Sequence, residues 1–450
     1  MRRYLLSAAL ALPLLLLPAV AQVEVTSINC TNAAETSGHV RWPQTDPVWE
    51  FDIVRPEATE TGLTPRGTGL EIRDVHYRGR KVMERGNVPV INVEYDPGGC
   101  SCFRDWEDNE VNFVADGALP GASSCIALAT AGTVMSTCDT GTGGTPGSFR
   151  GVSFEDYGSE LVITSHMSAG WYRYRMKWHF YTDGRIWPEY SYSANTATCT
   201  TASHRHHAYW RFDFDIDGTP TNDVISEHSA MGSTTTFTAE ASRTWGDPQD
   251  GIYWSVRDTD TQAGYDIVPS SEDLLLPIDA FSKTDALVLR YKATELDDGG
   301  GGCAIDYNSE MNGESLDGQD VVFWYRSSAL HTGGNPFECD IVGPSLNPVG
   351  LAVATGAPAM AGAAIEIDAA VPNPFMPSTT VRFRVADAQQ VRVVLYDALG
   401  RQIETLFDGP VEANRYETLQ IDGASLPTGT YVVRVEGETA SGSTRIVLAR

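Results

Sequence analysis

The sequence has little basic charge. Its 450 residues contain 32 Lys and Arg against 59 Asp and Glu, which gives a formal net charge of −27. Binding to a nucleic-acid backbone needs clustered basic side chains, so this composition argues against a nucleic-acid partner. The hydrophobic content of 42%, with 10% aromatic residues, is enough to bury a sizeable core. We therefore expect a folded protein with two or three domains.

Long apolar runs are missing after the first residues. Arg2 and Arg3 precede an apolar run at residues 5–19, and the small residues 19–21 form a cleavage site before Gln22. This arrangement predicts a signal peptide over residues 1–21. A membrane anchor is the alternative, but the run is short for a membrane span. We expect the mature chain outside the cytoplasm.

The sequence contains no CxxC pair, which makes a cysteine-ligated zinc site the less favoured interpretation. Its 8 cysteines, an even number in an oxidising compartment, instead predict as many as four disulfides. The pairing cannot be deduced from the sequence. We expect Cys100 and Cys102 to bond to separate partners, because a bridge between them would be strained.

Sustained helical periodicity is also absent, and strand-like alternation takes its place. Residues 172–180 alternate aromatic or apolar side chains with basic ones, which puts the two classes on opposite faces of one strand. The Thr-Asp-Gly turn at residues 182–184 predicts a hairpin. We predict an all-β chain with one large β-sandwich over residues 22–345. An Ala, Gly and Pro-rich linker is expected over residues 346–370.

Residues 371–450 contain short alternating segments separated by turn residues, which predicts a small immunoglobulin-like β-sandwich. We expect its strands at residues 380–385, 391–396, 416–421, 431–436 and 444–448. This segment resembles the C-terminal sorting domain of the type IX secretion system. Four motifs carry the resemblance: Pro-Asn-Pro-Phe with Ser-Thr-Thr at residues 372–380, residues 394–401, residues 426–431 and the terminal Arg450. It implies contact with the type IX machinery and a secreted or outer-membrane location. An ordinary adhesion module is the alternative.

A histidine cluster is the first candidate for chemistry. On a strand, His204 and His206 share one face while His207 points to the other. Two neutral imidazoles on a rigid strand suit copper or zinc. A surface-exposed pair of histidines is the alternative.

Three aspartates follow the histidines at alternate positions. Asp213, Asp215 and Asp217 resemble the start of an EF-hand loop, but the twelfth position is Val224, where a glutamate is required. The EF-hand interpretation therefore fails. Three carboxylates on one strand face still favour either a hard cation or a solvated edge.

The order of segments resembles the catalytic domain of the copper amine oxidases, the topaquinone enzymes. The resemblance runs from about residue 48 to residue 331, and its segments are residues 48–51, 68–80, 93–97, 161–174, 178–186, 204–218, 264–269 and 318–331. It implies a catalytic domain that uses copper, topaquinone and calcium.

The resemblance also implies individual roles. It makes His204, His206 and His331 the copper ligands, Tyr172 the precursor of topaquinone, and Tyr95 its hydrogen-bond partner. The implied calcium ligands are Asp213, the Phe214 carbonyl, Asp215, Asp320 and the Val321 carbonyl. The catalytic base falls in the acidic stretch that contains Asp105, which we favour, and its rivals Glu107 and Asp108.

The motif around the cofactor tyrosine departs from the family pattern. The family has Asn-Tyr-Asp/Glu-Tyr, whereas this chain has Trp171, Tyr172, Arg173 and Tyr174. The resemblance implies a primary amine oxidase that converts an amine, O₂ and water to an aldehyde, ammonia and hydrogen peroxide. The alternative is a degenerate surface or adhesive protein that binds copper and calcium without oxidising amines. Family members are generally dimers, so a homodimer is also implied.

Overall fold

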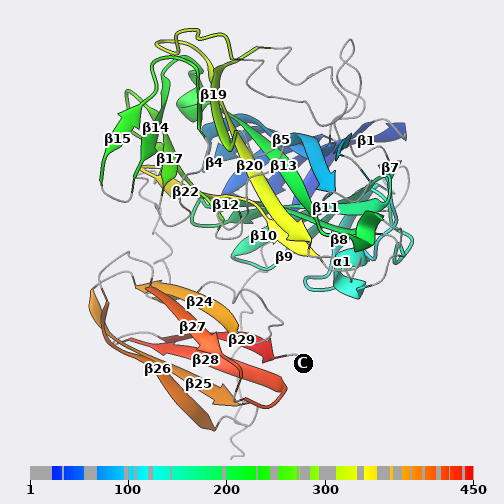
Figure 1. Cartoon of the computed structure of the whole chain (residues 1–450), viewed down its shortest axis with the longest axis vertical. Coiled ribbons are helices and arrows are strands. Elements are labelled where there is room, and N and C mark those ends of the chain that lie inside the picture. The colour runs from blue at the N-terminus through cyan, green and yellow to red at the C-terminus, as the bar shows by residue number, and fades with distance from the viewer. Residues whose placement is uncertain are drawn as a thin grey trace, which may run out of the picture. The chain divides into compact units, whose positions relative to one another are not determined.

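β-strands are the predominant elements of the described residues, and the computed structural model divides the chain into two units, Met1–Val353 and Ala354–Arg450 (Figure 1). The residues that the structure describes are 23–32, 35–54, 68–95, 100, 102–105, 109–119, 125–141, 144–194, 199–229, 232–243, 252–270, 273, 284–292, 311–331, 339–351, 365–367, 378–385, 388–397, 401–411, 417–424, 426–437 and 441–448. The predicted signal peptide lies outside them.

The first sheet of the larger unit carries the histidine strand near its middle. Its strand order is β1-β2-β3-β4-β5-β13-β20-β19-β16, with β6 paired to β5. The strands are β1 (Glu24–Asn32), β2 (Glu35–Trp42), β3 (Trp49–Val54), β4 (Thr68–Tyr77), β5 (Arg80–Tyr95), β6 (Cys102–Asp105), β13 (His204–Phe214), β16 (Ala241–Arg243), β19 (Ala286–Arg290) and β20 (Val321–His331).

The second sheet carries Tyr172. Its order is β15-β14-β17-β18-β22-β12-β11-β10-β9-β8, with β21 paired to β12 and β7 paired to β10. The strands are β7 (Asn109–Glu110), β8 (Ile126–Ala129), β9 (Val152–Asp156), β10 (Glu160–Ala169), β11 (Tyr172–Tyr181), β12 (Ile186–Ala194), β14 (Asp223–His228), β15 (Thr234–Thr236), β17 (Tyr253–Asp258), β18 (Gly264–Val268), β21 (Asp340–Val342) and β22 (Ser345–Val349).

One apolar core joins the two sheets. Trp178 of β11 packs edge-on against Trp210 of β13, with ring centroids 5.5 Å apart. The Trp178 indole N–H also donates to the Leu70 carbonyl of β4 across 3.0 Å. Both tryptophans are fully buried. The predicted all-β class and large sandwich are confirmed, and the strand predicted at residues 172–180 is β11.

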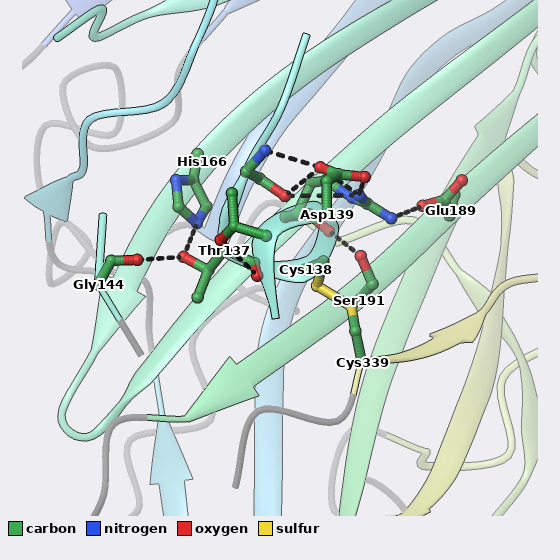
Figure 2. Close-up of a disulfide and its surroundings, with 11 residues drawn as sticks. Thr137, Cys138, Asp139, Gly144, His166, Glu189, Ser191 and Cys339 are labelled. Carbon is green, nitrogen blue, oxygen red and sulfur yellow. Dashed lines mark hydrogen bonds and ion pairs between the residues drawn. A yellow bond between two sulfur atoms is a disulfide. The ribbon is translucent and has the colours of Figure 1, made fainter. Parts of the chain in front are cut away.

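A disulfide fixes the short helix α1 (Thr137–Thr140) against the outer face of the second sheet. Cys138 is bonded to Cys339, which directly precedes β21 (Figure 2). Asp139 accepts a hydrogen bond from the buried Arg175 of β11 at 2.9 Å, and Arg175 also donates to Glu189 of β12 at 2.6 Å. Because a buried guanidinium needs anionic partners, α1 and β12 together satisfy its charge.

A second disulfide joins Cys100 to Cys199, and no described cysteine is free. The structure therefore bonds Cys100 to a distant partner, as expected. Two short 3₁₀ turns, η2 (Cys199–Thr201) and η3 (Ile216–Gly218), flank the histidine strand β13. Within the described residues, no helix is both long and apolar enough to cross a membrane.

The C-terminal unit is a separate sandwich of two small sheets with their own core. The sheet orders are β23-β24-β27 and β26-β25-β28-β29. The strands are β23 (Ile365–Ile367), β24 (Ser378–Val385), β25 (Gln389–Asp397), β26 (Gln402–Val411), β27 (Glu417–Asp422), β28 (Gly429–Glu436) and β29 (Ser441–Leu448). Five of these correspond to the predicted strands, and β23 and β26 were not predicted.

The strand ladders set domain limits that differ from the predicted ones. Strand β22 pairs with β18, so residues 346–349 belong to the larger sandwich and not to the predicted linker. Strand β23 pairs with β24, so residues 365–367 belong to the C-terminal unit. Both segments satisfy backbone hydrogen bonds that a linker would leave to water. Residues 352–364, the middle of the predicted linker, lie outside the described residues.

Candidate active site

Three neighbouring strands of the first sheet bring distant residues together. Strand β13 pairs with both β5 and β20, and Figure 1 shows β13 beside β20. In this register His204 lies directly opposite His331 on one side and Tyr95 on the other. Tyr172 starts β11 in the facing sheet, after a tight turn in which Gly170 has φ of +51°. Glycine suits that left-handed conformation.

The side chains of these residues form one buried cluster. The His204 ring lies 4.6 Å from the His331 ring and 5.0 Å from the His206 ring, measured between centroids. The Tyr172 ring is edge-on to His206 at 4.4 Å. His204 and His331 are 0% exposed and Tyr172 is 1% exposed. The exposed-pair alternative for His204 and His206 is therefore wrong.

A chain of hydrogen bonds runs through the cluster. The Tyr95 hydroxyl donates to the Tyr172 hydroxyl at 3.1 Å, and the Tyr172 hydroxyl lies 2.7 Å from His204 Nε2. His204 Nδ1 lies 2.7 Å from the Ala202 carbonyl oxygen, which can only accept. Nδ1 therefore carries the proton in neutral His204, and Nε2 accepts from Tyr172. The hydrogen bonds therefore run from the Tyr95 hydroxyl to the Tyr172 hydroxyl, and from the Tyr172 hydroxyl to His204 Nε2.

Burial keeps two of the histidines neutral. It lowers the pKa of His204 to about 4, and it holds the pKa of His206 well below its usual value of 6.5, with a further lowering from the neighbouring histidines. A neutral imidazole is the form that binds a metal. Both rings are therefore in the ligand form at neutral pH.

The side chains of the cluster are of a kind that binds copper. Three buried imidazoles are a donor set that suits copper. His206 Nε2 is buried and has no hydrogen-bond partner in the described part of the chain. However, no three His, Cys, Asp or Glu side chains among the described residues are already arranged as a metal site. The His204 and His331 planes are only 25° apart, so the rings must reorient to share one ion.

Two tyrosines of this site are not among the predicted residues. Tyr174 of β11 and Tyr192 of β12 are both 0% exposed and both contact His206. The signal available in the sequence was the alternation along these two strands, which puts Tyr172 and Tyr174 on one face. The pairing of β11 with β12, which brings Tyr192 beside them, is a tertiary feature.

Trp171 is the exposed neighbour of the buried cluster. It is 40% exposed, and its ring lies edge-on to the Tyr95 ring with centroids 6.1 Å apart. The next residue along the chain from Tyr172, Arg173, donates to the Tyr172 carbonyl at 2.9 Å. Trp171 and Arg173 thus flank Tyr172: the first packs against Tyr95, and the second donates to the Tyr172 carbonyl.

The predicted base lies on the strand next to Tyr95. Asp105 ends β6 and is the register partner of Ile91 on β5. The side chain of Asp105, and the rivals Glu107 and Asp108 entirely, lie outside what the structure describes. The assignment of the base stays a prediction.

The predicted calcium ligands lie where β13 ends and β20 begins. Asp213 is the register partner of Val322, so Phe214 and Val321 are near neighbours across the ladder. Asp213 is paired with Arg211 at 3.2 Å and Asp215 with Lys81 at 3.0 Å. The second oxygen of Asp215, Oδ1, is buried without a hydrogen-bond partner among the described residues. Calcium stays a prediction.

Comparison with protein families identifies the tail. Residues 370–449 match the model described as a secretion system C-terminal sorting domain. The predicted sorting domain is confirmed, and it indicates secretion with cell-surface or outer-membrane association. Comparison with curated protein sequences gives no match.

Solved structures that match this chain include amine oxidases. A copper-containing benzylamine oxidase from Hansenula polymorpha matches with a TM-score of 0.45 and 14% identity, over 69% of this chain and 59% of that chain. An Aspergillus nidulans amine oxidase matches with a TM-score of 0.46 and 17% identity, over 69% and 51%. The Pichia pastoris lysyl oxidase matches with a TM-score of 0.44 and 12% identity, over 73% and 69%. The chain thus spans little more than half of the first two relatives.

Proposed function

We propose that this chain is a secreted, copper-dependent primary amine oxidase whose cofactor forms from Tyr172. The observation that carries the proposal is the Tyr172 hydroxyl 2.7 Å from His204 Nε2, beside the His206 and His331 rings. When bound, copper with O₂ would supply the oxidation of Tyr172 to topaquinone, and the quinone would supply the electron sink for converting an amine, O₂ and water to an aldehyde, ammonia and hydrogen peroxide.

The chain's own residues prepare Tyr172 for this chemistry. His204, His206 and His331 would hold the metal, and the Ala202 carbonyl keeps Nε2 of His204 free of a proton. The Tyr95 hydroxyl donates to the Tyr172 oxygen, which favours negative charge on that oxygen. The cluster excludes water through its burial, which strengthens these interactions.

A carboxylate is needed to remove the α-proton of the amine, and we propose Asp105 for this role. Strand β6 places Asp105 beside β5, the strand that ends at Tyr95. The net charge of −27 would attract protonated amines to the molecule, although it would also aid solubility. The type IX machinery is the proposed export partner, and a homodimer follows only from the family resemblance.

We also propose that calcium binds between the ends of β13 and β20. The proposed ligands are Asp213, Asp215 and Asp320 with the carbonyls of Phe214 and Val321. The buried Oδ1 of Asp215, which has no partner in the described chain, supports this placement. Calcium should raise the melting temperature of the wild type but not that of Asp215→Asn.

A specific observation favours a second candidate function. Trp171 occupies the position where the family motif has asparagine, and its indole packs against Tyr95. The second candidate function is that of a surface or adhesive protein, which would bind copper and calcium without oxidising amines. The two candidates share the metal cluster and differ in whether Tyr172 is modified.

Amine-dependent peroxide release tests the leading proposal. The purified chain, loaded with Cu²⁺ in air, should release hydrogen peroxide from at least one member of a panel of primary amines. Tyr172→Phe, which keeps the ring and removes only the hydroxyl, should release none while still binding copper. Equal release by the wild type and Tyr172→Phe would overturn the assignment of Tyr172.

A further inference from the structure

Two tyrosines contact different parts of the His206 imidazole. The Tyr174 hydroxyl lies 3.4 Å from His206 Nδ1. The Tyr192 ring lies face to face with the imidazole, with centroids 3.6 Å apart and planes at 28°. All three side chains are buried, so water cannot take the place of either contact.

The arrangement follows from strand register. Tyr174 and Tyr192 are directly opposite each other in the β11–β12 ladder, and both face the core that the two sheets share. His206 projects into the same core from β13 of the other sheet. Tyr174 and Tyr192, a cross-strand pair of one sheet, therefore both contact His206 of the other sheet.

The two histidines of β13 are held by different means. His204 is fixed by a backbone acceptor, the Ala202 carbonyl, at Nδ1. For His206 the partner at Nδ1 is the Tyr174 side chain, and Nε2 is left buried and without a partner in the described chain. A partner at one ring nitrogen decides which nitrogen is left for a metal, and stacking decides the plane of the ring.

We infer that Tyr174 and Tyr192 are positioning residues, which orient His206 so that Nε2 is presented to the metal. The role of presenting Nε2 to a metal rests on the proposed copper site. The contacts of Tyr174 and Tyr192 with His206 are present without metal. Tyr174 occupies Nδ1 and so leaves Nε2 for the metal. Tyr192 fixes the plane of the ring by stacking on it. Neither residue is proposed to react.

The first experiment uses the metal-free protein. A proton held over the face of an aromatic ring resonates upfield, so the His206 ring protons should be shifted upfield in the NMR spectrum. Tyr192→Phe keeps the ring and should keep the shift, whereas Tyr192→Leu should lose it. His206 resonances at ordinary positions in the wild type would overturn the inference.

The second experiment measures copper. Loss of an outer partner of a metal ligand typically costs about 10–100-fold in affinity. We expect losses in this range for Tyr174→Phe and Tyr192→Leu, together with an altered Cu²⁺ EPR spectrum, and near-complete rescue in Tyr192→Phe. The matched control is Tyr190→Phe, which removes one hydroxyl from the tyrosine that stacks on Tyr174 at 5.4 Å. It should match the wild type.

The outcomes separate the inference from the proposed function. A wild type that binds no copper but shows the upfield shift would reject the copper site and support the positioning of His206. Copper affinity and EPR spectra that are unchanged in Tyr174→Phe and Tyr192→Leu would reject the positioning role even if amine oxidation is found. A loss of affinity in Tyr190→Phe equal to that in Tyr174→Phe would also reject it, because the effect would then be general to the core.

Discussion

The hydroxyl of Tyr172 donates a hydrogen bond to Nε2 of His204 across 2.7 Å, although the two residues are 32 positions apart in the sequence and belong to different sheets. The proton on His204 Nδ1, held by the Ala202 carbonyl, fixes this direction. The oxygen that would have to be activated therefore already lies at the nitrogen that would bind copper.

Removal of His331 should abolish tight copper binding. His331→Ala removes one of three proposed ligands, so the loss should exceed the roughly 10–100-fold cost of losing an outer partner. Copper content after dialysis against a weak chelator measures this. His228→Ala, on β14, is the control and should retain copper. Copper retained by His331→Ala at the wild-type level would remove His331 from the site.

Replacement of Trp171 by asparagine should increase turnover. Trp171 is 40% exposed at a hairpin turn, so the fold should tolerate the change with a stability effect of about 0.5 kcal/mol or less. Trp171→Asn places asparagine before Tyr172, as in the motif that this segment resembles, and leaves Arg173 unchanged. Under the proposed function, we expect amine-dependent peroxide release to rise several-fold. Trp171→Phe, which retains an aromatic ring, should not show the rise. A lower rate in Trp171→Asn than in the wild type would contradict this interpretation.

Loss of the Cys138–Cys339 disulfide should destabilise the larger unit. The bond links positions 201 residues apart, and removing a native disulfide commonly costs about 2–5 kcal/mol. All 10 tryptophans precede residue 354, so tryptophan fluorescence during urea unfolding reports on this unit alone. The double variant Cys138→Ser/Cys339→Ser should unfold at lower urea. An unchanged midpoint would show that α1 needs no covalent anchor.

Asp273 should make the protein less stable as the pH rises. Burial raises the pKa of Asp273 from 3.8 to about 7, despite hydrogen bonds from the Tyr325 hydroxyl and the Ser328 amide. The folded state then holds a proton that the unfolded state releases, so stability falls between about pH 4 and pH 7, by at most about 4 kcal/mol. Above pH 7 this contribution is constant.

The matched variant for this pH effect is Asp273→Asn, which is neutral throughout and has a similar shape. The free energy of unfolding of the variant should fall less than that of the wild type between pH 4.5 and pH 7. Parallel curves for the two proteins would assign the pH dependence to other groups.

The sequence predicted those parts of the fold that depend on local pattern. The alternation after Tyr172 predicted β11, and the alternation after His204 predicted which two histidines share a face. Strand β26 (Gln402–Val411) was not predicted because it is a largely exposed edge strand, which needs no apolar alternation. The place of Tyr192 beside His206 depends on the register of β12 and on the packing of two sheets, which local pattern does not specify.

The most direct test of the central claim is the chemical state of Tyr172 after copper loading. The metal-free protein is incubated with Cu²⁺ in air, treated with phenylhydrazine, digested and analysed by mass spectrometry. The account predicts a visible absorption band and a phenylhydrazine adduct on the peptide that contains Tyr172, both absent in Tyr172→Phe and in wild type kept free of oxygen. Copper bound by the wild type with Tyr172 recovered as unmodified tyrosine would contradict it.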